Sequence, residues 1–274
     1  MLHGAAPEVE PIARVRLHVE ARGEGPAVLF LHGFAGSARN WRRQLGALSG
    51  RFRAIAFDAR GHARSEAPDD PAAYRMDRLL EDALGVLAGE GAAAATWVGL
   101  SLGAAVALEA ALRAPEAVRG LVLASFPAGR GAARGVSAHA EAFAEAIERE
   151  GVEAAGARFA WGPGSGLDAR GAALVRAGFL EHPPHGLAHT LRGVLAALPP
   201  ADARRAALAR IAAPTLVVAG ALDDASAAPS RALAEAIPGA RLEIVPGAGH
   251  VVNLAQPARF DALLAAFLAR ATAG

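Results

Sequence analysis

A chain of 274 residues is long enough for one large domain, or for a core domain that carries a substantial insertion. Its hydrophobic fraction of 53% is typical of a folded globular protein, and its formal net charge of +1 provides no electrostatic reason to bind nucleic acid or an anionic membrane. Cysteine and lysine are absent, which excludes thiol nucleophiles, thiolate metal sites, disulfides and a Schiff-base lysine.

The N-terminal sequence MLHGAAPE lacks the basic start and apolar run of a secretory signal. No window of the sequence reaches the roughly 18 to 20 uninterrupted apolar residues that a membrane-spanning helix needs. We therefore expect a soluble cytoplasmic protein.

Seven short runs rich in β-forming residues predict the strands of a sheet. Most consist of Val, Ile, Leu or Phe without polar alternation, which is typical of strands buried on both faces of a parallel sheet. The first run alternates apolar with polar residues, so we place it at an edge, in antiparallel orientation. The predicted strands are Val15–Glu20, Val28–Leu31, Ala54–Phe57, Thr96–Val98, Leu121–Ala124, Thr215–Ala219 and Leu242–Val245.

Helical stretches fall between these strands. Such alternation predicts right-handed crossovers and an open, mostly parallel α/β sheet flanked by helices. The predicted helices are Arg39–Leu48, Met76–Ala88, Ser101–Arg113, Arg231–Ala236 and Pro257–Arg270.

The strand pattern is interrupted between residues 126 and 210. This stretch holds no convincing strand and has the pattern of helices separated by Gly- and Pro-rich turns. We therefore predict a core domain of residues 1–125 and 211–274, with a helical cap inserted at 126–210. A cap over the edge of a sheet commonly shapes a substrate pocket.

A serine lies between two glycines in the sequence GLSLG, directly after a predicted strand and before a predicted helix. This arrangement is the nucleophile elbow, in which a strained turn exposes the hydroxyl and glycine is needed where a Cβ would clash. The alternative is a solvated serine that caps the following helix. We favour Ser101 as a nucleophile.

A serine nucleophile needs a general base, and His250 in the sequence PGAGH follows the last predicted strand. The acid that orients this histidine should lie between the two, in the chain order Ser…Asp…His. Asp223 and Asp224 both follow the strand Thr215–Ala219. We favour Asp223, because it is the first carboxylate after the turn, and keep Asp224 as the alternative acid. If Asp224 is not the acid, it is expected to be a helix-start or turn residue.

Two backbone N–H groups are expected to stabilise the charge that develops on the carbonyl oxygen. One belongs to Leu102, directly after the nucleophile. The other is assigned to Phe34, which ends the sequence His-Gly-Phe after the strand Val28–Leu31. His32 in that sequence is expected to have a structural hydrogen-bonding role.

Five segments, LHGFAGSARNW, FDARGHARS, VGLSLG, PTLVVAGALD and PGAGH, match the α/β-hydrolase superfamily in order and spacing. The chain resembles this superfamily over nearly its whole length, and its small bacterial carboxylesterases and 3-oxoadipate enol-lactonases most closely. The resemblance implies an eight-stranded sheet with a helical cap and a mainly structural turn at residues 58–62. Its site residues fall on Ser101, Asp223 and His250 as a triad, and on Phe34 and Leu102 as oxyanion donors.

These features predict a serine hydrolase that cleaves a carboxylic ester of a small, mostly apolar substrate through an acyl-enzyme, without metal or organic cofactor. Three alternative functions remain: an enol-lactone hydrolase, a cofactor-free lyase or C–C bond hydrolase with the same triad, and a binding protein with this fold. The serine argues against the epoxide hydrolase and haloalkane dehalogenase branches, whose nucleophile is Asp. The expected partner is a small-molecule ester or lactone, with no nucleic acid and no membrane; a homodimer is left open.

Three histidines, His182, His185 and His189, gather in the predicted cap. A metal site requires converging ligands, usually with a carboxylate or thiolate, and this spacing does not favour one. We expect these side chains to be solvated or to line a pocket.

Overall fold

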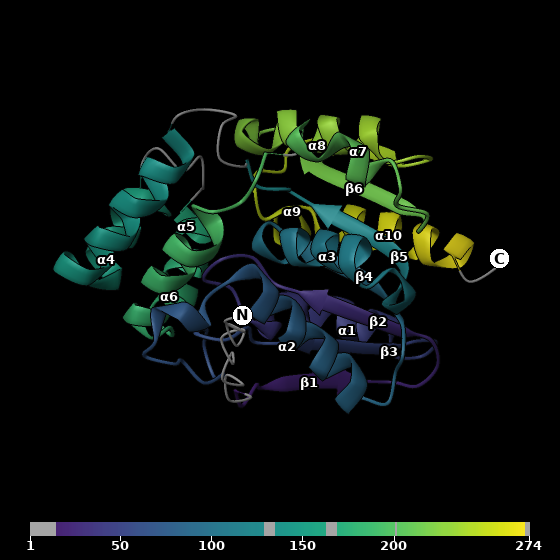
Figure 1. The fold of residues 1–274 in the computed structure, drawn as a ribbon, viewed down its shortest axis with the longest axis horizontal. Helices are drawn as coiled ribbons and strands as arrows, with labels where there is room; N and C mark the ends of the chain where they lie inside the picture. The colour runs from purple at the N-terminus through teal and green to yellow at the C-terminus, as the bar shows by residue number, and fades with distance from the viewer. Residues whose placement is uncertain (1–14, 129–134, 163–168, 201, 272–274) are drawn as a thin grey trace, which may run out of the picture.

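The computed structural model describes residues 15–128, 135–162, 169–200 and 202–271 (Figure 1). Within these ranges seven strands form one sheet in the order β1-β3-β2-β4-β5-β6-β7. Only β1 is antiparallel to its neighbour; the other pairs are parallel. The strands are β1 (Val19–Arg22), β2 (Ala27–Leu31), β3 (Arg53–Phe57), β4 (Ala95–Leu100), β5 (Val118–Ala124), β6 (Thr215–Gly220) and β7 (Arg241–Val245).

The predicted mostly parallel α/β sheet with an antiparallel edge strand is confirmed, with differences in the number of strands and in where some of them begin and end. The described residues contain seven strands, where the resemblance implied eight. The first strand also begins at Val19 and not at Val15, because the segment before it bonds to the loop after β3. There the Arg16 carbonyl accepts from the Glu66 N–H, and the His18 carbonyl accepts from the Asp58 N–H.

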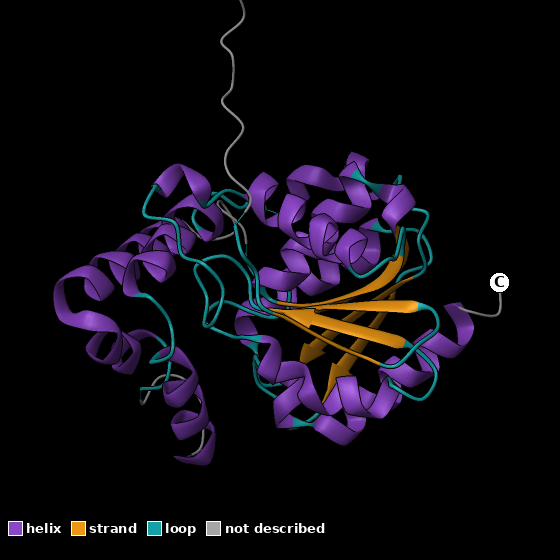
Figure 2. Ribbon diagram, turned by 90° about the horizontal axis from the view of Figure 1, so that it is seen from below, coloured by secondary structure: helices purple, strands orange, loops and turns teal. Residues whose placement is uncertain are grey.

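Helices cover both faces of the sheet (Figure 2). Alternate residues of one strand enter two different cores: Leu29 packs with α2 (Met76–Gly89), α3 (Leu102–Arg113) and α8 (Asp224–Ala236). Phe30 packs instead with residues of α1 (Arg42–Leu48) and α10 (Pro257–Ala271). Because both faces are buried, the strands carry no polar alternation. Short helices also occur in the described part of this region: η1 (Ala38–Trp41), η2 (Pro71–Ala73), η3 (Pro115–Ala117), η6 (Asp202–Arg204), α7 (Arg205–Leu208) and α9 (Val252–Ala255).

Between β5 and β6 the described residues form helices and no strand. These helices gather beyond the carboxyl ends of the strands (Figures 1 and 2). They have a core of their own, which also takes in Ala35 from the loop after β2. Leu208 of α7 packs instead in the core beside α3 and α8, so the end of the predicted cap lies against the sheet. The helices of this group are α4 (Gly135–Phe159), α5 (Ala169–Phe179), α6 (Pro184–Thr190) and the π-helical turn η5 (Leu191–Leu195).

The division into a core domain and a cap stays a prediction. None of the helices in the described part of the chain combines the length and apolar character needed to cross a membrane. The N-terminal sequence on which the absence of a secretory signal was argued lies outside the described residues.

Candidate active site

Ser101 occupies the turn between β4 and α3. Its backbone has φ 52° and ψ −110°, a left-handed conformation that is strained for any residue other than glycine. Its N–H donates to the Ala124 carbonyl and its own carbonyl accepts from the Ala105 N–H, so the turn is anchored on both sides. Only 8% of the residue is exposed. This is the strand–turn–helix geometry that the elbow motif predicts.

At each of the two glycines of the motif, another segment of backbone lies where a side-chain Cβ would otherwise be. A Cβ on Gly99 would lie 2.3 Å from the Gly103 carbonyl oxygen. A Cβ on Gly103 would lie 2.2 Å from the Leu31 carbonyl oxygen. Both obstacles are backbone atoms, which cannot rotate away as a side chain can. The spacing of the motif therefore reflects the packing of the start of α3 against β4 and the end of β2.

Asp223 and His250 meet after the carboxyl ends of β6 and β7. His250 Nδ1 lies 2.8 Å from Asp223 Oδ2 and donates to it. The Asp223 side chain is 5% exposed and that of His250 is 45% exposed, so the acid is buried behind an accessible ring. Asp224, the competing candidate, is an exposed residue in the first turn of α8. The structure thus pairs His250 with the first of the two aspartates.

Electrostatics keep the Asp223 carboxylate ionised. Burial by itself would raise the pKa of this carboxyl group, but hydrogen bonds from His250 and Ser226 and the charge of His250 lower it below its ordinary value. Ser226 Oγ also lies 3.3 Å from His250 Nδ1. Sequence reasoning missed Ser226, whose only signal was its position three residues after an aspartate at a helix start.

The loop after β2 runs beside the nucleophile candidate. A Cβ on Gly33 would lie 3.5 Å from Ser101 Cβ, so the backbone before Phe34 passes against the serine. Leu102 is the first residue of α3, where an N–H has no acceptor within the helix. In the described part of the chain neither the Phe34 nor the Leu102 N–H donates a hydrogen bond. Both therefore have the donor available that an oxyanion site requires.

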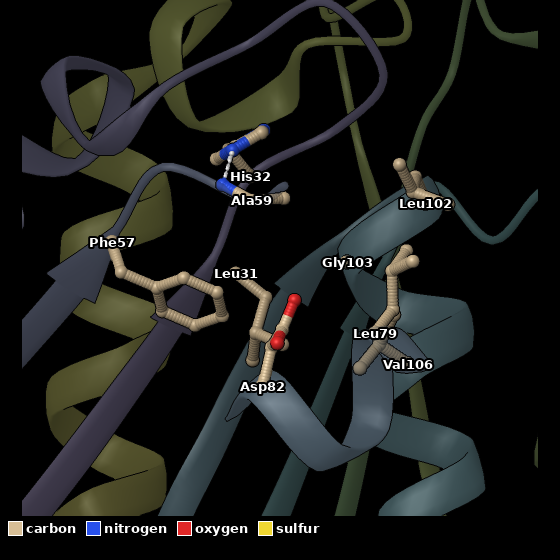
Figure 3. Close-up of a pocket in the computed structure, with 9 residues that line it drawn as sticks. All are labelled: Leu31, His32, Phe57, Ala59, Leu79, Asp82, Leu102, Gly103 and Val106. Atoms are coloured by element: carbon tan, nitrogen blue, oxygen red, sulfur yellow. Dashed lines mark hydrogen bonds between the residues drawn. The ribbon is translucent and has the colours of Figure 1, made fainter. Parts of the chain in front are cut away.

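His32 fixes this loop, as predicted for a structural residue. Its Nδ1 donates to the Gly33 carbonyl at 2.7 Å. Its Nε2 accepts from the Ala59 N–H at 2.9 Å, a bond drawn in Figure 3. Burial lowers the pKa of His32, so the ring is neutral and can accept at Nε2. The loop is thereby tied to the turn after β3.

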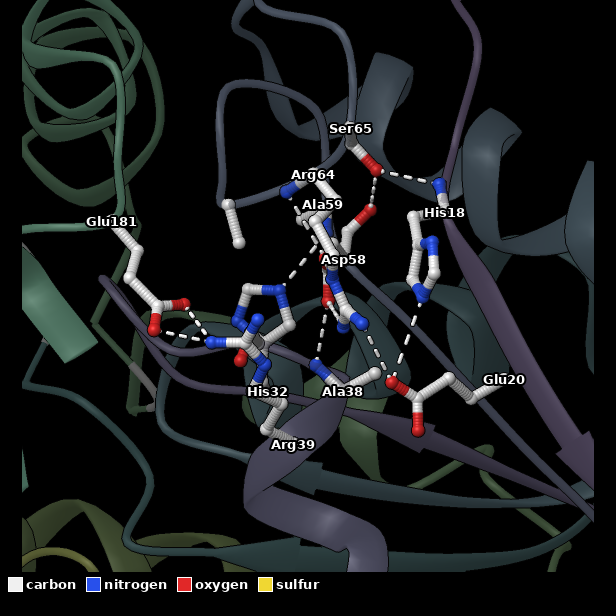
Figure 4. Close-up of polar contacts among 12 residues, drawn as sticks. His18, Glu20, His32, Ala38, Arg39, Asp58, Ala59, Arg64, Ser65 and Glu181 are labelled. Carbon is white, nitrogen blue, oxygen red and sulfur yellow. Dashed lines mark hydrogen bonds and ion pairs between the residues drawn. The ribbon is translucent and has the colours of Figure 1, made fainter.

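The turn after β3 has the structural role that the sequence predicts. Asp58 is fully buried, and its carboxylate accepts from the Ala38 N–H at 2.7 Å and from Arg64 Nε at 2.8 Å (Figure 4). Two residues further on, Arg60 pairs with Asp82 at 2.7 Å. These buried charges are matched by partners within the fold.

Beside His32 lies a cavity of about 20 Å³, drawn in Figure 3. That volume suits about one water molecule and not a substrate. Its lining residues are Leu31, His32, Phe57, Ala59, Leu79, Asp82, Leu102, Gly103 and Val106.

The expectation for the histidines after α5 is wrong for His182. This residue is 6% exposed, and both of its ring nitrogens are bonded to backbone groups at 2.7 and 2.8 Å. It is buried because it spans the gap between the helices after β5 and the loops of the sheet. His185 is partly exposed near Asp69, and the ring of His189 packs on Tyr74. Within the described ranges no group of three or more His, Asp or Glu residues is arranged to hold a metal ion.

Acid should destabilise the fold through three neighbouring buried histidines. Burial lowers the pKa of His182 from 6.5 to about 4, against the opposing charges of Glu181 and Asp58, and it lowers the pKa values of His32 and His62 too. In the unfolded chain these rings protonate near pH 6.5, while the folded state holds them neutral. Their contribution to stability is therefore complete above about pH 6.5 and decreases as the pH falls towards 4.

For His182 alone the loss of unfolding free energy is on the order of 3 kcal/mol. Urea unfolding at a series of pH values between 7.5 and 4.5 would measure it, with His182→Gln as the comparison, since that variant should lose less stability on acidification. A wild-type curve that is flat over this window would contradict the prediction.

Comparisons of the sequence and fold with known proteins identify the family of this chain. A model of the alpha/beta hydrolase family matches residues 28–263. A hydrolase from Pseudomonas aeruginosa PA01 is 32% identical with a TM-score of 0.80, covering 93% of this chain and 94% of that one. The enol-lactonase from Burkholderia xenovorans LB400 is 26% identical with a TM-score of 0.81, covering 93% and 97%.

An epoxide hydrolase from Caballeronia sordidicola is 41% identical over 114 residues, which are 41% of this chain and 35% of that protein. The chain thus matches about a third of the length of that relative. The family model, in contrast, spans most of this chain, from β2 into α10. The chain belongs to the alpha/beta hydrolase family.

Proposed function

We propose that this protein hydrolyses a carboxylic ester of a small, mostly apolar substrate through an acyl-enzyme on Ser101. The observation that carries the proposal is the 2.8 Å hydrogen bond between His250 Nδ1 and the buried carboxylate of Asp223. A carboxylate that holds one ring nitrogen fixes the tautomer, and the other nitrogen, Nε2, is then the basic one. The elbow presents Ser101 at the same edge of the sheet.

In the proposed reaction Ser101 Oγ attacks the ester carbonyl carbon and its proton passes to His250 Nε2. The N–H groups of Phe34 and Leu102 stabilise the oxyanion. Collapse breaks the bond to the alcohol, which leaves with the proton from His250. Water then attacks the acyl group by the reverse transfers and releases the acid and the free serine. Every proton is carried by the chain's own residues, and no step needs a metal or organic cofactor.

The apolar surroundings of the oxyanion loop support a small apolar substrate. The Phe34 ring lies edge-on to Phe143 of α4 at 5.8 Å and to Phe179 of α5 at 5.9 Å, measured between ring centroids. Aromatic side chains from the helices after β5 thus surround the residue that carries one oxyanion donor. Such a wall favours an apolar acyl or alcohol group over a long polar one.

Enol-lactone hydrolysis is the second candidate, favoured by the similarity to the Burkholderia xenovorans enol-lactonase along almost the whole chain. A lactone opens by the same acyl transfer, but its leaving alcohol stays attached to the acyl group. The epoxide hydrolase match carries less weight, because it covers only 41% of this chain and 35% of that protein.

Initial rates with p-nitrophenyl acetate, butyrate and octanoate, beside an enol-lactone, test the proposal. We expect the short esters to be hydrolysed faster than the octanoate, and a fluorophosphonate probe to label the protein. Faster turnover of the lactone would favour the second candidate. Labelling without turnover of either class would point to a lyase or a C–C bond hydrolase. If the protein shows neither labelling nor turnover, the proposal of a serine hydrolase of any kind is overturned.

A further inference from the structure

His182 joins two loops of the sheet to the helices that follow β5. It lies between α5 and α6, 147 residues from one of its partners and 119 from the other. Its Nε2 donates to the Ala35 carbonyl at 2.8 Å, and its Nδ1 accepts from the Ala63 N–H at 2.7 Å. Both contacts are to backbone, so they constrain the course of the two loops and not only their side chains.

The loop held at Ala35 is the one that carries the Phe34 N–H. Ala35 has φ 50° and Ala63 has φ 43°, left-handed values that are strained for alanine. Strained backbone persists only where the surroundings over-determine it, and it clusters at functional sites. His182 bonds to both of these residues. The residue that directly follows Phe34 is thus bonded to a side chain from the segment between α5 and α6.

The chemical state of the ring suits this double contact. Burial lowers the pKa of His182 to about 4, so the ring is neutral at pH 7, with a proton on Nε2 and a lone pair on Nδ1. The neutral ring of His62 packs edge-on at 5.3 Å and places no cation beside it. A charged ring would carry a second proton on Nδ1, facing the Ala63 N–H, and would break that contact.

We propose that His182 is a positioning residue for ester hydrolysis, which holds the Ala35 carbonyl so that the adjoining Phe34 N–H points at the oxyanion. This inference rests on the proposed function. It makes the helices after β5 part of the catalytic geometry, beyond any role in shaping a substrate pocket. Donors that stabilise an oxyanion act in the transition state, so the contact should govern kcat and leave KM nearly unchanged.

Four variants test the proposal. His182→Ala removes both contacts. In His182→Gln the side-chain amide nitrogen reaches the position of the ring Nε2 and can donate to Ala35, whereas the shorter His182→Asn reaches only the position of Nδ1. His185→Ala is the matched control: it removes a histidine whose Nε2 donates to the carbonyl of Ala67, a partly exposed residue, at 3.1 Å.

With p-nitrophenyl butyrate we expect His182→Ala to lower kcat by about 10- to 100-fold with KM within about threefold of wild type. The Gln variant should recover most of kcat, the Asn variant should stay low, and His185→Ala should match wild type. Three results would each overturn the proposal: an unchanged kcat in folded His182→Ala, a loss confined to KM, or an equal loss in His185→Ala.

Hydrogen exchange separates this inference from the proposed function. In His182→Ala the peptide over residues 30–38 should exchange faster than in wild type and in His185→Ala, while peptides from β4 and β5 stay protected. Unchanged exchange over residues 30–38 overturns the positioning role even where esters are hydrolysed. If wild type shows no Ser101-dependent hydrolysis, the proposed function fails, and the exchange result still decides whether His182 holds the loop.

Discussion

Ser101→Ala is expected to lower kcat for p-nitrophenyl butyrate by roughly 10³-fold or more, with the melting temperature almost unchanged. The variant deletes only Oγ, the atom assigned to attack the carbonyl carbon. Alanine has the same Cβ as serine, so the backbone strain at φ 52° is the same in both proteins. Stopped-flow initial rates on wild type and variant, beside thermal unfolding, measure both quantities.

Ser125→Ala provides a matched control. Ser125 follows β5 as Ser101 follows β4; it has φ 47°, is fully buried, and its Oγ has no hydrogen-bond partner in the described part of the chain. This control should keep the wild-type rate. Equal rates in Ser101→Ala and wild type would show that Ser101 is not the nucleophile. A loss in the Ser125 variant alone would move the assignment to that residue.

Asp223→Asn should reduce kcat by roughly 10³- to 10⁴-fold, the second large effect. The Asp223 carboxylate accepts the proton-bearing Nδ1 of His250, whereas an asparagine amide can turn its NH₂ group to that nitrogen and stabilise the opposite tautomer. Nε2 would then carry the proton and could not accept one from the serine. The change preserves the size of a side chain that is only 5% exposed.

Asp224→Asn is the control for this variant, because Asp224 is the exposed neighbour in the first turn of α8. Its rate should stay within about threefold of wild type. Fluorophosphonate labelling of both variants gives a second readout, since attack by Ser101 needs the same base. A larger loss of rate in Asp224→Asn than in Asp223→Asn would identify Asp224, and not Asp223, as the acid that orients His250.

The residues of the candidate active site are positioned by contacts over three different ranges. The elbow is local, built by β4, α3 and two glycines. The acid–base pair comes from loops after two neighbouring strands of the sheet. The loop proposed to carry an oxyanion donor also contacts the helices after β5. Phe34 packs against aromatic rings of α4 and α5, and its neighbour Ala35 is bonded to His182. Substitutions in the helices after β5 should therefore affect turnover as well as substrate choice.

The sequence alone predicted features that depend on near neighbours in the chain. Strands buried on both faces are visible as apolar runs, since Leu29 and Phe30 each need an apolar environment on opposite sides of the sheet. The elbow is visible because a Cβ on Gly99 or Gly103 would strike backbone within 2.3 Å. His32 was predicted as structural, and its bond to the next residue's carbonyl is local.

Only the tertiary structure decided features that depend on contacts between distant segments. The sequence favours Asp223 over the adjacent Asp224 only by its place directly after the turn. In the structure Asp223 is buried and bonded to a histidine 27 residues away, whereas Asp224 is exposed. His182 was expected to be solvated or to line a pocket, because the backbone groups that bond its ring lie 119 and 147 residues away in the sequence. A short motif indicates backbone constraints among residues close together in the chain. Hydrogen bonds between distant segments depend instead on how the helices after β5 pack on the sheet, and no local sequence pattern specifies that packing.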